Sequence, residues 1–100
     1  MALEMSNYEK TEKLLNALAS KTRLQILELI REGTSNPGAM ARKLKRHRST
    51  IEKHLRVLLA ARIVEKVPSL SRSGHLTIQY KISANAVELL SVVQEASEKF

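Results

Sequence analysis

The sequence predicts a mostly helical domain that carries one small β-hairpin, an α+β fold. Apolar residues recur at helical spacing over most of the chain, and residues 75–82 alternate strictly between apolar and polar side chains. The chain is 43% hydrophobic but only 3% aromatic, so its core must be built from Leu, Ile, Val and Ala, which favours helices packed on a small sheet. Residues 1–100 are expected to form a single domain, because no linker divides them.

Three helices are expected in the first part of the chain. Leucines at helical spacing predict the first over about residues 8–19. Ser20 can cap a second helix, whose apolar stripe ends at Gly33, a residue type that commonly closes helices. Pro37 marks the start of a third helix, which runs to about Lys45, because proline at the first helical position loses no needed N–H.

A fourth helix carries the most informative pattern. Ser49 and Glu52 form a capping box, in which the serine accepts a backbone N–H and the glutamate reaches back, so this helix is expected to start at residue 50. With the preceding helix it makes a pair joined by a short turn, over about residues 37–61. One face of the fourth helix is polar and the other is apolar, the apolar side chains being Ile51, Leu55, Leu58 and Leu59.

A β-hairpin is expected over about residues 63–82. Its first strand, Ile63 to Val67, should end at Pro68, and residues 75–82 should form a half-buried strand with one wet face. The loop between the strands holds Arg72 at its tip. Because Ser and Gly surround this arginine, we expect a loop that is mobile when free and becomes ordered on a ligand.

The last helix is expected over about residues 85–99, where Asn85 and Glu88 offer a second capping box. Its apolar side chains spread over more than half of its circumference, and the first helix is similarly broad, whereas one core-facing stripe needs only about 100 degrees. The surplus predicts that both terminal helices pack against their counterparts in a second subunit, unless they cover each other within one chain. The interface candidates are Leu14, Leu15, Leu18, Leu89, Leu90 and Val93.

All of the excess positive charge lies in one segment. Residues 42–66 hold nine Lys and Arg against two Glu, whereas the rest of the chain is balanced, so this segment accounts for the formal net charge of +7. A polyanion is therefore the first partner to consider, and a solvated helix face is the plain alternative. The absence of cysteine excludes thiol chemistry, and no catalytic constellation stands out, so we do not expect an enzyme.

Two helices joined by a short turn and followed by a hairpin form the order of a winged helix-turn-helix. Residues 17–30, ALASKTRLQILELI, resemble the opening signature of ArsR-like transcriptional regulators, and residues 49–58, STIEKHLRVL, resemble their recognition helix. The similarity covers about residues 12–90. It implies a sequence-specific regulator that binds double-stranded DNA as a homodimer at an inverted repeat, with the recognition helix in the major groove.

The candidate DNA contacts follow from this geometry. Ser49, Thr50 and Lys53 should face base edges, because the first turns of a recognition helix enter the groove. Arg56 lies one turn further along and is expected to reach phosphate, while Arg72 can enter a narrow minor groove. Three further candidates are expected to clamp the DNA backbone before the helix, namely Arg46, His47 and Arg48. His54 lies at the edge of the apolar face, where it either contacts DNA or packs in a partly buried position.

The chain departs from the family pattern in two places. Neither residues 38–42 nor residues 86–90 hold the Cys, His or acidic ligands of the family's metal sensors, and the three histidines lack metal-ligand spacing. No metal and no cofactor is therefore expected. Family members also commonly have Gly after the recognition helix, whereas this chain has Arg62, so the helix exit is expected to be altered or strained.

Two other functions are compatible with the same residues. An architectural protein that coats DNA with little specificity would share the basic segment, and a protein-interaction module could use the same fold. The residues do not specify the operator, the effector or the sign of regulation. Because no apolar stretch approaches the roughly 18 residues of a membrane span and the N-terminus is not a secretory signal, a cytoplasmic protein without membrane partners is expected.

Overall fold

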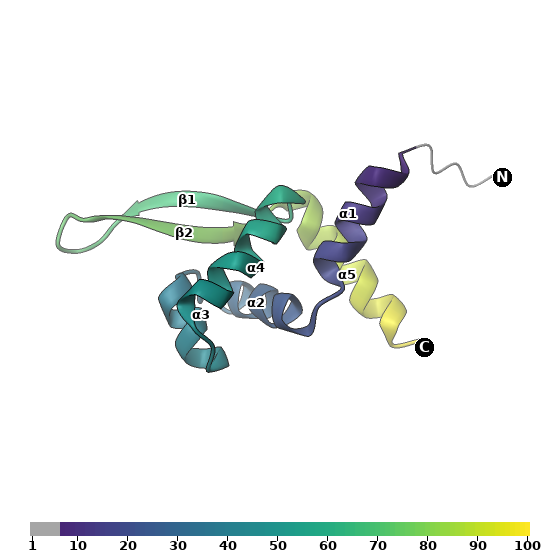
Figure 1. Ribbon diagram of the computed structural model, residues 1–100, viewed down its shortest axis with the longest axis horizontal. Coiled ribbons are helices and arrows are strands. Elements are labelled where there is room, and N and C mark those ends of the chain that lie inside the picture. The colour runs from purple at the N-terminus through teal and green to yellow at the C-terminus, as the bar shows by residue number, and fades with distance from the viewer. Residues whose placement is uncertain (1–6) are drawn as a thin grey trace.

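The computed structural model describes residues 7–100. Within this part of the chain, four helices are followed by one hairpin of two antiparallel strands and then by a fifth helix (Figure 1). This order confirms the expected winged helix-turn-helix. The molecule is elongated, with extents of 56 × 25 × 21 Å. The hairpin projects from one end, and the first and last helices lie at the other (Figure 1).

The first two helices begin where side chains cap them. α1 (Tyr8–Leu18) follows Asn7, and α2 (Lys21–Arg31) follows Ser20, and each cap accepts a hydrogen bond from a backbone N–H of the first turn. Gly33 has a φ of +101°, in the left-handed region that glycine adopts without strain, so it closes the second helix as expected.

The next two helices form the helix-turn-helix. α3 (Pro37–Leu44) has its proline at the first helical position and is capped by the side chain of Asn36. Lys45 ends it in the left-handed conformation, with a φ of 55°, and α4 (Arg48–Ala60) begins after two further residues. The short turn therefore depends on a strained lysine, and it sets the angle between the two helices.

The start of α4 differs from the capping box that the sequence predicts. The helix begins at Arg48, and its N-cap is His47, whose side chain makes no capping hydrogen bond. Ser49 therefore lies inside the first turn, where it is no longer the cap. Glu52 pairs instead with Arg48 at 3.3 Å, since residues four apart meet on a helix surface.

The core forms around α4, which packs on α2, α3 and the first strand. Each fully buried Leu or Ile stabilises the fold by about 1.5–3 kcal/mol, so the orientation of α4 is strongly determined. Its apolar face points inward as expected, and its polar face is left for solvent. The enclosed side chains from α2, α3 and α4 include Ile26, Met40, Ile51, Leu55 and Leu58.

Pro68 does not end the first strand. β1 (Val64–Leu70) continues past it and pairs with β2 (Leu76–Ile82), with Pro68 opposite Ile78. The hydrogen bond from Ser71 N–H to the His75 carbonyl sets the alternation of the ladder, which puts Pro68 in a pair that exchanges no backbone hydrogen bonds. The missing N–H therefore costs the ladder nothing.

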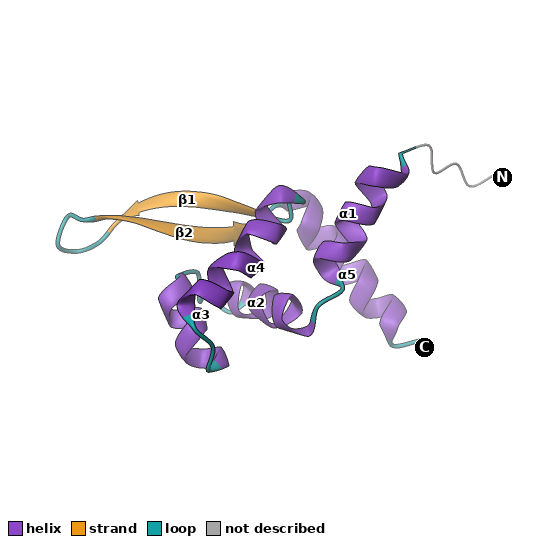
Figure 2. Ribbon diagram, viewed as in Figure 1, coloured by secondary structure: helices purple, strands orange, loops and turns teal. Residues whose placement is uncertain are grey.

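The apolar face of β2 is buried only at its base. Tyr80 is 9% exposed, whereas Ile78 is 41% and Leu76 is 70% exposed, so the expected half-buried strand is wrong for its outer part. The hairpin extends beyond the helices (Figure 2), and no other element of the described chain covers its tip. Strict alternation predicts which side chains share a face but not how far the core extends beneath it.

The last helix also starts earlier than its predicted capping box. α5 (Ala84–Ser97) is capped by Ser83, whose hydroxyl accepts a hydrogen bond from Ala86 N–H and donates one to the Arg62 carbonyl at 2.9 Å. This double role fixes the helix start to the exit of α4, and Asn85 lies inside the first turn. Within residues 7–100, no helix is long and apolar enough to cross a membrane.

The exit of α4 is strained, as expected from the arginine at a position where the similar family commonly has glycine. Arg62 has a φ of 60°, a conformation that costs a residue with a Cβ about 1–2 kcal/mol.

We expect Arg62→Gly to raise the free energy of unfolding in urea by about 0.5–1 kcal/mol, because relief of strain exceeds the added chain entropy. The control is Ala61→Gly at a φ of −87°, which should lower it by about 0.5–1 kcal/mol. Equal destabilisation by both substitutions would refute the strain.

Candidate nucleic-acid interface

The sequence-predicted DNA contacts divide into two groups in space. Eight of the nine lie on α4 or in the turn before it, and Arg72 alone lies at the tip of the hairpin. Thr50 and His54 are partly buried. The other seven side chains are exposed, namely Arg46, His47, Arg48, Ser49, Lys53, Arg56 and Arg72.

The basic segment at residues 42–66 faces solvent. All nine of its Lys and Arg residues are exposed, and in the described chain only Arg48 among them forms an ion pair, with Glu52. Both of these side chains are largely exposed, so the pair is screened by solvent and neutralises little of the field. The surface around α4 therefore keeps a concentrated positive charge that attracts polyanions.

His54 is held from inside the protein. Its Nδ1 lies 3.0 Å from Nη1 of Arg23 on α2. Because an arginine only donates, Nδ1 accepts this hydrogen bond and the ring is neutral. Burial, followed by the charges of Arg23 and Arg46, lowers the pKa of His54 below its ordinary 6.5. Only the remainder of the ring is left for a ligand.

Arg23 is a residue that the sequence analysis missed as a functional candidate. It lies in the signature at residues 17–30, but its partner His54 is 31 positions away. Local periodicity carries no signal for such a contact. Its guanidinium also donates to the carbonyl oxygens of Asn16 and Ala17, each at 2.8 Å.

The predicted interface residues of the terminal helices differ in exposure. Leu14, Leu18 and Leu90 pack against the core, and Leu89 is partly buried. In contrast, Leu15 is 58% and Val93 is 37% exposed. Further exposed apolar side chains, which the sequence analysis did not single out for the interface, are Val87 and Val92 of α5 and Phe100 beyond its end. One copy of the chain therefore leaves a broad apolar surface on α1 and α5.

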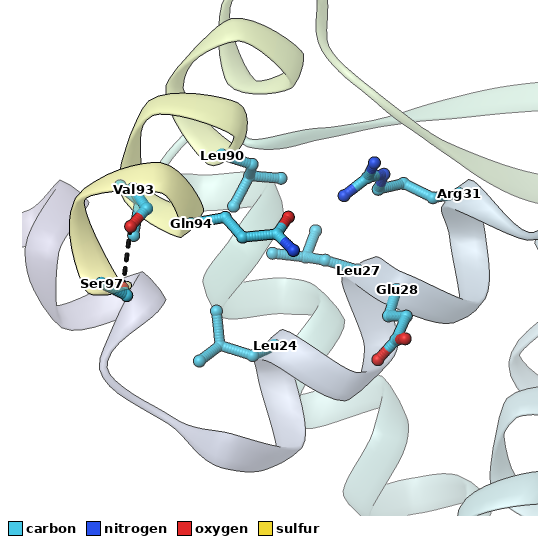
Figure 3. Close-up of a pocket in the computed structure, with 8 residues that line it drawn as sticks. All are labelled: Leu24, Leu27, Glu28, Arg31, Leu90, Val93, Gln94 and Ser97. Carbon is cyan, nitrogen blue, oxygen red and sulfur yellow. Dashed lines mark hydrogen bonds between the residues drawn. The ribbon is translucent and has the colours of Figure 1, made fainter. Parts of the chain in front are cut away.

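An apolar groove of about 310 Å³ separates α2 from α5. Leu24 and Leu27 form one wall and Leu90 and Val93 the other, while polar side chains surround them (Figure 3). These polar side chains are Glu28, Arg31, Gln94 and Ser97. None of the predicted DNA contacts lines the groove, so it is a feature separate from the basic surface.

The described residues offer no cluster of metal ligands. Within residues 7–100, no group of three or more His, Cys, Asp or Glu side chains comes together in a way that could hold a metal ion. His47 precedes α4 and His75 precedes β2, and the partly buried His54 is engaged by Arg23.

Comparisons with known proteins show that the chain carries a helix-turn-helix domain. A family model for the helix-turn-helix domain matches residues 18–67. The chain is 37% identical over 68 residues to the HTH-type transcriptional regulator Rv2034 of Mycobacterium tuberculosis. That match covers 68% of this chain but only 64% of the relative, so the chain spans less than two thirds of the relative's length.

Solved structures show the same architecture over nearly the whole chain. The homodimeric winged helix-turn-helix DNA-binding domain of Mb0332 from Mycobacterium bovis, a candidate ArsR-family regulator, has a TM-score of 0.76 and 25% identity, covering 99% of this chain and 92% of that one. NolR from Sinorhizobium fredii has a TM-score of 0.67 and 28% identity, covering 96% and 95%.

Proposed function

Because the chain belongs to the ArsR-like family of winged helix-turn-helix transcriptional regulators, we propose that it binds double-stranded DNA as a homodimer and regulates transcription from an inverted-repeat site. The observation that carries this proposal is the exposed basic surface on and around α4. The apolar face of the same helix is fixed in the core, so its polar face is presented in one orientation.

Each element has a different role in the proposed complex. The first turns of α4 enter the major groove, where Ser49, Thr50 and Lys53 meet base edges. Arg56 meets phosphate, and Arg72 on the wing meets the minor groove or its phosphates. The backbone-clamping group before and at the start of α4 is Arg46, His47 and Arg48. His54 stays a candidate contact through the part of its ring that Arg23 does not hold.

The homodimer follows from the exposed apolar surface of α1 and α5. Side chains such as Leu15, Val87 and Val92 stay more than half exposed within one copy of the described chain. A two-fold dimer buries such a surface on both subunits at once. It would present two α4 helices to successive major grooves, about 34 Å apart, which selects an inverted repeat.

The direct test is selection of a duplex from random sequences, followed by titration against a scrambled duplex of the same length. We expect the selected duplex to bind about a thousandfold more tightly, with a preference that persists as salt is raised. Equal affinity for the two duplexes would support the architectural alternative. No binding to either duplex at low salt would favour the protein-interaction module.

Metal ions are expected to leave this binding unchanged. Neither of the family's ligand sets is present in the chain, so zinc, copper or arsenite has no site through which to alter the DNA-bound form. The measurement is a titration of the selected duplex with and without each ion, with a chelator as control. A loss of affinity above roughly tenfold, about 1.4 kcal/mol, would contradict the prediction.

A further inference from the structure

One guanidinium joins three helices of this protein. Arg23, in the first turn of α2, donates from Nη2 to the Asn16 carbonyl and from Nε to the Ala17 carbonyl, each at 2.8 Å. A third nitrogen, Nη1, lies 3.0 Å from Nδ1 of His54 on α4. The two carbonyls belong to the last turn of α1, and His54 is next to Lys53 in the sequence.

The position of these contacts links the two surfaces that the proposed function uses. α1 carries the exposed Leu15 of the proposed dimer interface, and α4 carries the proposed base contacts. Arg23 lies between them and is itself only partly exposed. A planar guanidinium that donates to three acceptors fixes their relative directions as well as their distances.

We propose that Arg23 is a positioning residue for DNA binding, which holds α4 at a fixed orientation to α1 when His54 is neutral. This inference rests on the proposed function. In a dimer joined through α1, a change in the angle between α1 and α4 alters the spacing of the two recognition helices. Specific binding needs both helices in register, whereas binding to phosphate alone tolerates a change in their angle.

The chemistry of the contact makes it sensitive to protonation. Arg23 stays charged, so Nδ1 of His54 can accept only while it carries no proton. Protonation turns Nδ1 into a donor and opposes two cations across 3.0 Å. The charged groups that face His54 are Arg23 from α2 and Arg46 from the turn before α4, and both add to burial in lowering its pKa. On the side of α1, the carbonyls of Asn16 and Ala17 accept from the other two donor nitrogens of Arg23.

The expected sign distinguishes this arrangement from an ordinary DNA-contacting histidine. Protonation of a histidine that touches phosphate adds a cation and strengthens binding. Here the DNA-bound arrangement requires the neutral ring, so binding expels a proton and specific affinity falls as the pH drops below 6.5, through the lowered pKa of His54. The exposed His47, which lies in the turn before α4, is the histidine to compare with His54.

The experiment compares His54→Asn with wild type on the selected and scrambled duplexes between about pH 7.5 and pH 5.5, at fixed salt. Asparagine keeps an acceptor near Nδ1 but cannot titrate. We expect wild type to lose specific affinity on acidification by about threefold or more beyond any change in His54→Asn, when each protein is compared with its own affinity at the higher pH. The control His47→Asn should keep the acid-induced loss.

A second variant tests Arg23 itself. Arg23→Gln should lower affinity for the selected duplex by about tenfold, change the scrambled duplex much less, and lose the His54-dependent part of the pH profile. NMR of the His54 ring nitrogens reads the contact without DNA. It should show a neutral ring that carries its proton on Nε2, with Nδ1 becoming protonated only below pH 6.5 in wild type and at a higher pH in Arg23→Gln.

Several outcomes would overturn the inference. Acid-strengthened binding that His54→Asn abolishes would show a phosphate contact instead. If Arg23→Gln kept the affinity and the pH dependence of wild type, the contact between Arg23 and His54 would have no effect on DNA binding. If NMR showed the contact between Arg23 and His54 but the protein bound the selected and scrambled duplexes equally, the proposed function would be refuted, and the positioning role with it. If the contact were absent in a protein that clearly preferred the selected duplex, the positioning role alone would be refuted.

Discussion

Leu15→Asp is expected to convert the dimer into monomers and to lower affinity for the inverted repeat by about a hundredfold or more, because two linked recognition helices bind far more tightly than one. Leu15 is 58% exposed in a single copy, so its replacement opens no core cavity. Across a two-fold axis, however, the new carboxylate would be buried without a partner on both subunits.

Sedimentation at micromolar concentration measures the oligomeric state, and circular dichroism checks that each subunit stays folded. The matched control is Leu70→Asp, which places the same charge at an even more exposed leucine on β1, at the opposite end of the molecule (Figure 1). This control should stay dimeric. Leu90 is a poorer site for the test, because it packs against the core and its replacement would mix unfolding with dissociation. A dimer that survives Leu15→Asp would exclude α1 from the interface.

The difference between Leu15 and Leu90 shows what periodicity can predict about an interface. Both leucines lie on broad apolar helices, and the sequence indicates that such a helix has more apolar surface than one core needs. It does not indicate which part meets the core and which part is left over. That division depends on how the helices cross, which is set by contacts between distant segments.

Helix existence was predictable throughout, because each helix has a strong periodic pattern and a local start signal. Starts set by one local signal, the Ser20 cap of α2 and the proline at the first position of α3, were predicted correctly. Starts with two competing signals were wrong. At α4 the Arg48–Glu52 pair replaces the box at Ser49, and at α5 the tertiary hydrogen bond of Ser83 to Arg62 overrides a box that is equally good in sequence.

The candidate site was predictable in its charges but not in its internal contacts. A cluster of Lys and Arg in the sequence predicts a basic surface, because charged side chains are rarely buried in a core. The contact between Arg23 and His54 joins positions on separate helices, and no local rule connects them. Both residues lie in the segments that carry the family resemblance, but only His54 was a candidate from the sequence.

The second large effect separates the recognition helix from the wing. Lys53→Ala is expected to cost about 1–3 kcal/mol on the selected duplex and to flatten the preference at one position in each half-site. The reason is that Lys53 is exposed on the second turn of α4, where a side chain reaches base edges. Its loss removes discrimination along with affinity.

Arg72→Ala should behave differently. Arg72 is exposed at the hairpin tip, flanked by Ser71 and Ser73, whose hydroxyl oxygens lie 3.0 Å apart. A contact from there to phosphate or to a narrow groove depends on charge and width more than on base identity. We expect a more even loss across sequences, and a slope of log affinity against log salt that is shallower by roughly one unit per lost contact, about two per dimer.

Titrations of both variants on selected and scrambled duplexes, at several salt concentrations, measure the two effects together. Lys99→Ala is the charge control, because it removes one exposed cation beyond the end of α5 and should change neither the preference nor the salt slope by a full unit. If Lys53→Ala weakened both duplexes equally, Lys53 would be a phosphate contact. If Arg72→Ala spared the scrambled duplex alone, the wing would read sequence, and this division between helix and wing would be wrong.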